Sequence, residues 1–245
     1  MTAPELIVLD DKRDVIARVA EDTRQVLADV LANQSEAHLV LTGGTVGIGV
    51  LTQLGNSDNG SVDWSRVHLW WGDERWLAEA DAERNDEQAR TGFIEALAFP
   101  ASNVHRMPAS TSGLSLDEAA RWYAQQLAQF APDGDLPRFD LIFLGVGPDA
   151  HVASLFPGHP AGAESMSSVI AVHNSPKPPP ERLSLTLRAL ASATRVWLVA
   201  AGDDKAEAIS LARGPSDFTK APASAARGSR ETRIYCDRAA AQTTT

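Results

Sequence analysis

The chain has 245 residues, of which 44% are hydrophobic, and a formal net charge of −10 at pH 7. These values favour one large domain over residues 1–245, and the acidic balance argues against a nucleic-acid surface and against docking on an anionic membrane. The single cysteine, Cys236, excludes an internal disulfide and is typical of a reducing cytoplasm. No signal peptide and no apolar run of about 18 residues is found, so export and membrane spanning are not expected.

Apolar runs and stretches of helical periodicity alternate along the chain. Strands are predicted at residues 5–10, 38–44, 66–76, 139–145, 168–172, 182–187, 194–202 and 233–237. Helices are predicted at residues 12–33, through Val50, Leu51 and Leu54, and at 85–98, 115–130 and 203–213. Residues 220–230 are expected to form a small-residue loop, and residues 239–245 a frayed tail. The alternation predicts an α/β fold with a mainly parallel sheet and helices on both faces.

The glycine-rich segment TGGTVG, residues 42–47, lies between a predicted strand and a predicted helix. Glycines at such a position let backbone N–H groups approach an anion, and the amino end of the helix adds favourable partial charge. A tight strand-to-helix turn would use the same glycines, so both interpretations stay open. The segment lacks the lysine of the GxxxxGK[ST] loop, which disfavours a nucleoside triphosphate.

Basic residues stand at three further strand ends. The GDER segment ends on Arg75, whose planar guanidinium suits a phosphate or a carboxylate. Lys177 lies in a proline-rich segment, residues 175–181, and Arg182 begins the strand that follows. Lys205 lies near the start of a helix after a buried strand. A solvated loop is the alternative explanation for Arg75, and ordinary solvated charges are the alternative for Lys177, Arg182 and Lys205.

Residues 139–158, FDLIFLGVGPDAHVASLFPG, read as a buried strand that opens into a glycine-rich turn. Ligands of open α/β sheets bind outside the carboxyl ends of the strands, so a turn that carries Asp149 and His151 is a natural place for catalysis. Imidazole can act there as a general base near neutral pH, although a single histidine is more often structural. A dinucleotide-binding site is disfavoured here, because Pro157 and Gly158 would interrupt the helix that its fingerprint requires. A metal site is disfavoured as well, because no carboxylate has the spacing that a helical metal site requires.

Six segments in this order resemble the 6-phosphogluconolactonase family, over about 170 residues. The resemblance implies a Rossmann-like, mainly parallel sheet, shared with glucosamine-6-phosphate deaminases and ribose-5-phosphate isomerases. It also implies hydrolysis of 6-phospho-D-glucono-1,5-lactone in the oxidative pentose phosphate pathway, without cofactor or metal, by a cytoplasmic monomer or weak homo-oligomer. The matching segments are LTGG (41–44), WGDER (71–75), ERN (83–85) with Ala89 and Arg90, GVGPDAHVASLFPG (145–158), SPKPPPERLSLTL (175–187) and GDDKAEAI (202–209).

The resemblance implies a role for each candidate residue. His151 would activate water for attack on the lactone carbonyl carbon, with Asp149 close by. Arg75 would bind phosphate or stabilise the developing oxyanion, and Lys177 belongs to the matched proline-rich segment without a settled role. The phosphate candidates are Gly43, Gly44, Thr45, Lys205 and Arg182.

Two departures from the family pattern bear on the site. The usual GGSTP continues here as Thr45, Val46 and Gly47 after the glycines, which removes one hydroxyl and the proline. The usual PDGH reads PDAH, with Ala150 in place of glycine. If that position needs a positive φ, alanine costs about 1 kcal/mol or more of strain.

Two rival functions remain. A sugar-phosphate isomerase or deaminase of the same fold resembles the chain at the strand ends, but carries a tyrosine where this chain has Arg75 and a glutamate where it has Phe156. Ring opening and proton shuttling lack a partner without that acid, so hydrolysis is favoured. A non-catalytic sugar-phosphate sensor would not need Asp149 and His151 in a glycine-rich turn.

Overall fold

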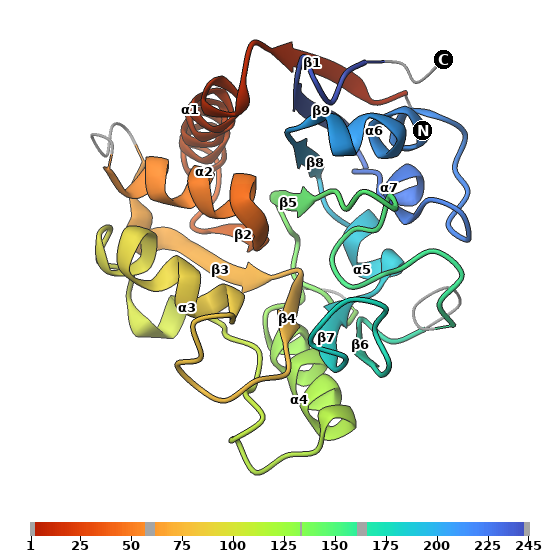
Figure 1. Cartoon of the computed structure of the whole chain (residues 1–245). Helices are drawn as coiled ribbons and strands as arrows, with labels where there is room; N and C mark the ends of the chain where they lie inside the picture. Colours follow the sequence, from red (N-terminus) through yellow and green to blue (C-terminus); the bar gives the residue numbers. More distant parts are fainter. Residues whose placement is uncertain (1–2, 57–61, 133, 161–165, 243–245) are drawn as a thin grey trace.

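The computed structural model describes residues 3–56, 62–132, 134–160 and 166–242. Six strands form the central sheet: β1 (Glu5–Leu9), β2 (Ala37–Leu41), β3 (Val67–Trp71), β5 (Leu141–Gly145), β8 (Arg195–Ala200) and β9 (Glu231–Asp237). Their order is β1-β9-β8-β5-β2-β3, and every neighbouring pair is parallel (Figure 1). The predicted parallel sheet is confirmed.

Helices cover both faces of this sheet. They are α1 (Lys12–Leu31), α2 (Gly44–Asn56), α3 (Asn85–Ala89), which continues as a π-helix at Arg90–Glu95, α4 (Leu116–Gln129), α5 (Leu187–Ala191), α6 (Ala206–Arg213) and α7 (Pro222–Ala225). Short 3₁₀ turns lie at Trp64–Arg66, Ala101–Asn103 and Asp203–Lys205. In Figure 1, α1, α2 and α3 lie on one side of the sheet, and α5, α6 and α7 on the other.

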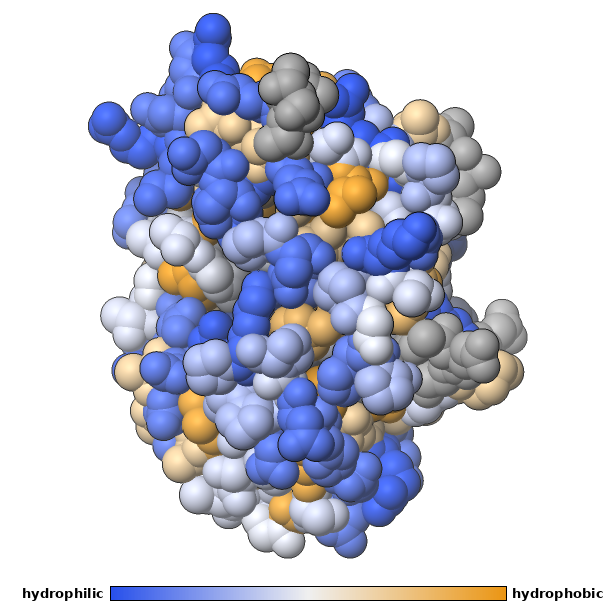
Figure 2. All heavy atoms as spheres, turned by 45° about the vertical axis from the view of Figure 1, so that its right-hand side comes forward, coloured by the Kyte–Doolittle hydropathy of each residue, from blue (hydrophilic) through white to orange (hydrophobic). Residues whose placement is uncertain are grey.

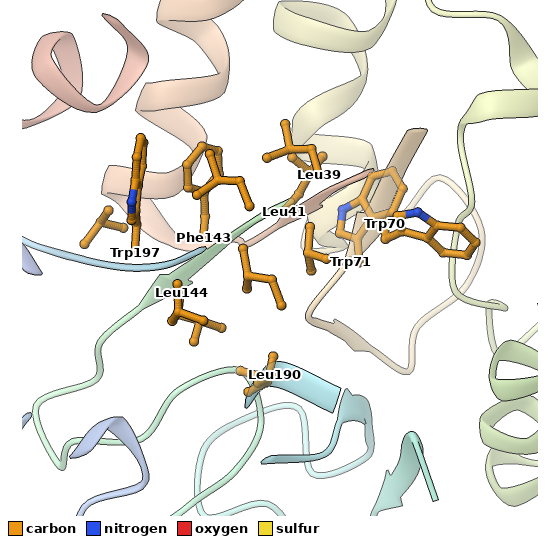
Figure 3. Close-up of a cluster of buried hydrophobic side chains, with 14 of the residues drawn as sticks. Leu39, Leu41, Trp70, Trp71, Phe143, Leu144, Leu190 and Trp197 are labelled. Carbon is orange, nitrogen blue, oxygen red and sulfur yellow. The ribbon is translucent and has the colours of Figure 1, made fainter. Parts of the chain in front are cut away.

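The core fills the space between the sheet and these helices. Successive side chains of a strand point to opposite faces, so each central strand must be apolar on both. In Figure 3, Phe143 and Trp197 point toward α1 and α2, whereas Leu144 points toward Leu190 of α5. All four side chains are buried. This packing fixes the carboxyl ends of the strands, where the polar segments begin.

The strand predicted at residues 66–76 is in fact two strands. The chain belongs to the parallel sheet as far as Gly72, whose N–H donates to Leu41 O at 2.9 Å. The Gly72 carbonyl instead accepts from Leu185 N at 2.8 Å, which carries the chain into a second sheet. That sheet is antiparallel, in the order β4-β7-β6, and consists of β4 (Asp73–Arg75), β7 (Arg182–Leu185) and β6 (Val169–Val172).

The region predicted as a loop at residues 220–230 contains the helix α7. Proline begins this helix at Pro222, where its missing N–H costs nothing, and the alanines that follow are small enough to be buried. Arg227 donates to carbonyl groups of Ala212, Ala223 and Ala226, which fixes the segment against α6. Of the predicted frayed tail, Ala240 is fully buried, and residues 243–245 lie outside the described residues.

The surface is predominantly hydrophilic on the face that Figure 2 shows, and its apolar side chains are scattered. None of the helices in the described part of the chain combines the length and apolarity that crossing a membrane would need.

Candidate active site

A cavity of about 420 Å³ opens at the carboxyl ends of the central strands. It lies between β2 and β5, which are neighbours in the sheet. From β2 the chain proceeds outward to β3 on one side, and from β5 it proceeds outward to β8 and β9 on the other. Such a switch point separates two loops and leaves a crevice between them. Here the two loops meet through Gly145 N, which donates to Thr42 Oγ1 at 3.2 Å.

The structure brings the predicted site residues together at this cavity. Asp149 alone among the predicted residues does not line the cavity, but it contacts two side chains that do, those of His151 and Lys177. The predicted residues in the wall are Gly43, Gly44, Thr45, Arg75, His151, Lys177, Arg182 and Lys205.

His151, Asp149 and Lys177 form a hydrogen-bonded group. His151 Nδ1 lies 2.5 Å from Asp149 Oδ1, and Lys177 Nζ lies 2.9 Å from the same oxygen and 3.2 Å from Nδ1. Burial alone would raise the pKa of Asp149, but the hydrogen bonds from His151 and Lys177 hold it well below its ordinary value. An ionised carboxylate can only accept, so Nδ1 carries the hydrogen, and in the neutral imidazole the lone pair is then on Nε2. The imidazole is therefore in the tautomer that a general base requires.

The turn that carries this group depends on two backbone positions. A Cβ added at Gly147 would lie 2.0 Å from both Cε1 and Nδ1 of His151, so glycine is required there for space. Ala150 has φ 61°, which confirms that the position of the family's glycine is left-handed. Hydrogen bonds from Ala150 N to Gly147 O and from Ala223 N to Ala150 O hold this strained residue in place.

The glycine-rich segment forms the opposite wall. Gly44 begins α2 with φ 80°, a backbone conformation that favours glycine, and it faces open space. Gly43 is needed for a different reason, since an added Cβ would lie 2.0 Å from Asn85 Oδ1. The first N–H groups of α2 have no partners within the helix, and they lie at the cavity wall.

The GDER segment divides its side chains between the cavity and the protein interior. Asp73 and Arg75 line the cavity, whereas Glu74 points away, as alternation along β4 requires. Asp73 Oδ2 accepts from Ser154 Oγ at 2.6 Å, and Arg75 NH1 donates to Glu83 O.

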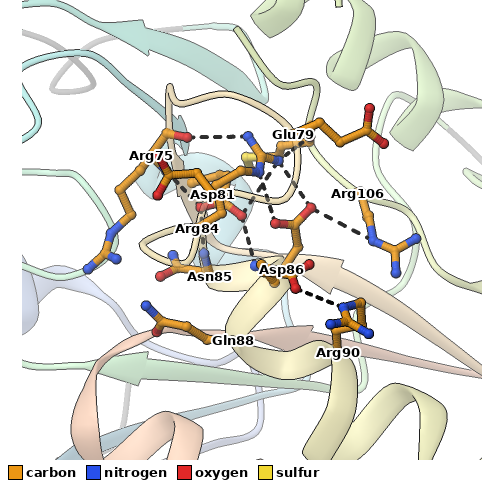
Figure 4. A network of polar contacts seen from close by, with 12 residues as sticks. Arg75, Glu79, Asp81, Arg84, Asn85, Asp86, Gln88, Arg90 and Arg106 are labelled. Carbon is orange, nitrogen blue, oxygen red and sulfur yellow. Dashed lines mark hydrogen bonds and ion pairs between the residues drawn. The ribbon is translucent and has the colours of Figure 1, made fainter. Parts of the chain in front are cut away.

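Glu74 supports the site from behind by accepting from the backbone N–H groups of Arg75, Asn85 and Asp86, at 2.7 to 2.9 Å. Burial and the Asp86 carboxylate raise the pKa of Glu74 to about 8, although Arg84 and the backbone donors act in the opposite direction. Figure 4 shows Arg84 between Asp86, to which it donates at 2.9 and 3.1 Å, and the carbonyl oxygen of Arg75. This network fixes Arg75 and Asn85 relative to each other.

Arg75 and Arg182 stand directly opposite each other in the antiparallel pairing of β4 and β7. Like charges at such a pair are unfavourable without an anion nearby. Arg182 is buried and donates to the carbonyl groups of Lys177, Pro178 and Pro179. Burial lowers the pKa of Arg182, a shift that Asp73 opposes and Arg75 reinforces. Arg182 therefore also holds the segment that presents Lys177.

Four polar residues of the cavity wall were missed as site residues in the sequence: Lys12, Thr42, Asp73 and Asn85. Thr42, Asp73 and Asn85 lie inside segments that matched the family pattern, so their motifs were a usable signal. Asn85 Nδ2 donates to Asp73 O at 2.9 Å, while its buried Oδ1 lacks a hydrogen-bond partner among the described residues. Lys12 carried no motif signal.

Phe156 occupies the position at which the rival isomerases and deaminases carry a glutamate. Its side chain is buried, and its ring centroid lies 4.7 Å from that of His151. An apolar ring therefore contacts the imidazole where an acid would otherwise stand. Within the described ranges, no three His, Cys, Asp or Glu side chains are placed to share a metal ion.

The parallel sheet, the switch-point cavity and its cationic walls define an α/β protein with a site for an anionic small molecule. Residues 10–235 match the family described as glucosamine-6-phosphate isomerases/6-phosphogluconolactonase, and the chain belongs to this family. It is similar to the 6-phosphogluconolactonase of Streptomyces coelicolor, with 45% identity over 244 residues that cover 97% of this chain and 94% of the relative. The 6-phosphogluconolactonase of Mycobacterium tuberculosis is 41% identical over 237 residues, which cover 96% of each chain.

Solved structures share the fold. A 6-phosphogluconolactonase from Trypanosoma brucei has a TM-score of 0.86 at 21% identity and covers 98% of both chains. A monomeric glucosamine-6-phosphate deaminase has a TM-score of 0.78 at 19% identity and covers 97% of this chain and 98% of its own. Both enzyme types are thus found on this fold, and the choice between them depends on the site.

Proposed function

We propose that the protein hydrolyses 6-phospho-D-glucono-1,5-lactone to 6-phospho-D-gluconate. The observation that carries the proposal is the His151–Asp149 contact of 2.5 Å at the wall of the cavity, which sets the imidazole in the form of a general base. The names of the curated relatives support the choice of substrate.

In the proposed reaction, His151 Nε2 takes a proton from water as the water oxygen bonds to C1 of the lactone. The carbonyl electrons move onto the carbonyl oxygen, where Arg75 and Lys177 supply positive charge. The carbonyl then re-forms as the C1–O5 bond breaks, His151 returns the proton to O5, and the carboxylic acid product loses its proton to water. Asp149 stabilises the imidazolium between the two transfers. A base of this kind contributes roughly 10²–10⁴ in rate.

The phosphate of the substrate is assigned to the amino end of α2 at Gly43, Gly44 and Thr45 and to the side chains of Lys205 and Arg182. Binding energy from this remote group positions the carbonyl beside the base. Such a division explains why several cations converge on one cavity in a protein of net charge −10.

We also propose that residues 1–245 form a single domain, because one apolar core runs from Val15 to Ala240. Its action as a cytoplasmic monomer or weak homo-oligomer is part of the same proposal.

The test is the rate at which purified protein converts the lactone to 6-phosphogluconate, read by coupling to 6-phosphogluconate dehydrogenase and NADP. Acceleration above the spontaneous rate is expected. A rate equal to the blank would exclude the lactonase, and binding of 6-phosphogluconate without turnover would favour a sensor. Turnover of glucosamine 6-phosphate would favour the deaminase, which Phe156 beside His151 argues against.

A further inference from the structure

The cavity has a cation that belongs to none of the matched segments. Lys12 is the first residue of α1 and follows β1, which lies at the edge of the sheet and two strands away from β8. Its side chain nevertheless forms part of the wall, together with the glycine-rich segment and Lys205.

A close contact between α1 and α2 brings Lys12 to this place. A Cβ added at Gly49 would lie 2.5 Å from Ile16 Cδ1, so the end of the Ile16 side chain packs directly on the α2 backbone at this glycine. Both helices follow strands of one parallel sheet on the same face, so they run in the same direction (Figure 1). One turn earlier in each helix stand Lys12 and Thr45, which are therefore neighbours at the cavity.

The charge of Lys12 is not neutralised by the acidic residues beside it in the sequence. Asp11 caps α1 by accepting from two N–H groups of the first turn, at 2.7 and 3.0 Å. Asp10 pairs with Arg238 at 2.6 Å. Within the part of the chain that the structure describes, no hydrogen bond or ion pair is formed by the Lys12 side chain. Its ammonium group is thus available to a ligand.

Helix stability does not account for a lysine at this position. The amino end of a helix carries partial positive charge, which favours acidic residues in the first turn and disfavours basic ones. A lysine that opposes the helix dipole, lies at a cavity and lacks an acidic partner has the features of a binding residue.

We propose that Lys12 binds the phosphate group of the substrate from the side of α1, together with Lys205 and the amino end of α2. The identity of the anion rests on the proposed function, whereas the cationic character of this end of the cavity does not. Lys12 acts in binding alone, because the proposed proton transfers at His151 do not involve it.

The test compares wild type with Lys12→Met, which keeps the apolar stem of the side chain, and with Arg13→Met as the matched control. Arg13 is exposed, has the same charge and lies in the same helical turn, but it does not line the cavity. Isothermal titration with 6-phosphogluconate and with inorganic phosphate, at low and high salt, needs no turnover. Urea unfolding of each variant checks that α1 still folds.

For Lys12→Met we expect roughly threefold to tenfold weaker binding of both ligands at low salt, a smaller difference at high salt, and a raised KM with kcat retained. Arg13→Met should bind as wild type does. Equal affinity of wild type and Lys12→Met at low salt would overturn the inference, as would the absence of phosphate binding in wild type. Lysine-dependent phosphate binding without lactone hydrolysis would instead overturn the proposed function and retain the inference.

Discussion

The ring of His151 occupies the space that a side chain at Gly147 would need, since an added Cβ would lie 2.0 Å from two atoms of the imidazole. Ala150, three residues later, has the left-handed φ of 61° at which glycine is the usual residue. Glycine is therefore required at position 147 for steric reasons, whereas position 150 accepts alanine despite its left-handed backbone.

Gly147→Ala should displace the imidazole from Asp149 and lower kcat by about 10²-fold, because a shift of about 1 Å in a catalytic group has an effect of that size. Gly72→Ala is the control, since an added Cβ there has its nearest neighbour at an ordinary 3.5 Å. The measurement is lactone turnover of both variants. Full activity of Gly147→Ala would mean that the position of the ring does not matter.

Ala150→Gly removes a residue from a strained conformation and also loses one buried methyl group. Relief of about 1–2 kcal/mol of left-handed strain is offset by the greater flexibility of glycine and by the lost methyl, so we expect a change below about 1 kcal/mol in the free energy of unfolding. Turnover should be retained. Ala208→Gly, a buried residue inside α6, should lose about 1 kcal/mol or more. Equal losses in the two variants, measured by urea unfolding, would argue against strain at Ala150.

The sequence predicts that both Arg75 and Arg182 bind an anion, but in the structure they have different hydrogen-bond partners. Arg182→Met should lower the free energy of unfolding by about 1–3 kcal/mol, because the carbonyl groups of Lys177, Pro178 and Pro179 lose their buried guanidinium donor. Arg75→Met should change it by less than about 1 kcal/mol, since loss of one contact is offset by relief of the cross-strand repulsion. Urea unfolding separates the two. The reverse order of stabilities would contradict this assignment.

Three histidines at the other end of the central strands should make the fold less stable in mild acid than it would be without them. His38, His68 and His105 stack with ring centroids 5.0 and 5.2 Å apart. Burial lowers the pKa of each, with added repulsion between them for His38 and His105, and that of His105 to about 4. At these three sites the unfolded chain binds more protons below pH 6.5, so their contribution to stability is complete above pH 6.5 and is lost as the pH falls toward 4, whereas the raised pKa of Glu74 acts in the opposite direction.

Urea unfolding between pH 7 and pH 5 measures this loss. As the pH falls, His105→Gln should gain stability relative to wild type, whereas the exposed His173→Gln should follow wild type. A stability difference between wild type and His105→Gln that does not change with pH would contradict the lowered pKa of His105.

Much of the fold could be predicted because hydrophobic runs and helical periodicity show which side chains of each strand and helix are buried. The break at Gly72 could not, since the change from apolar to charged residues in WWGDER also fits the end of a single strand, and only the backbone partners of Gly72 reveal two sheets. The pairing of Arg75 with Arg182 and the place of Lys12 were likewise hidden, because both depend on contacts between segments distant in sequence. Residues that share a short motif, such as Asp149 and His151, were within reach of sequence alone.

The most direct measurement is lactone hydrolysis above the spontaneous rate by wild type and by His151→Ala, with 6-phosphogluconate binding determined in parallel. Loss of a general base should reduce the catalysed rate by roughly 10²–10⁴ while binding persists, because the phosphate is held by other residues. Turnover by His151→Ala equal to that of wild type would contradict the assignment of His151 as the base.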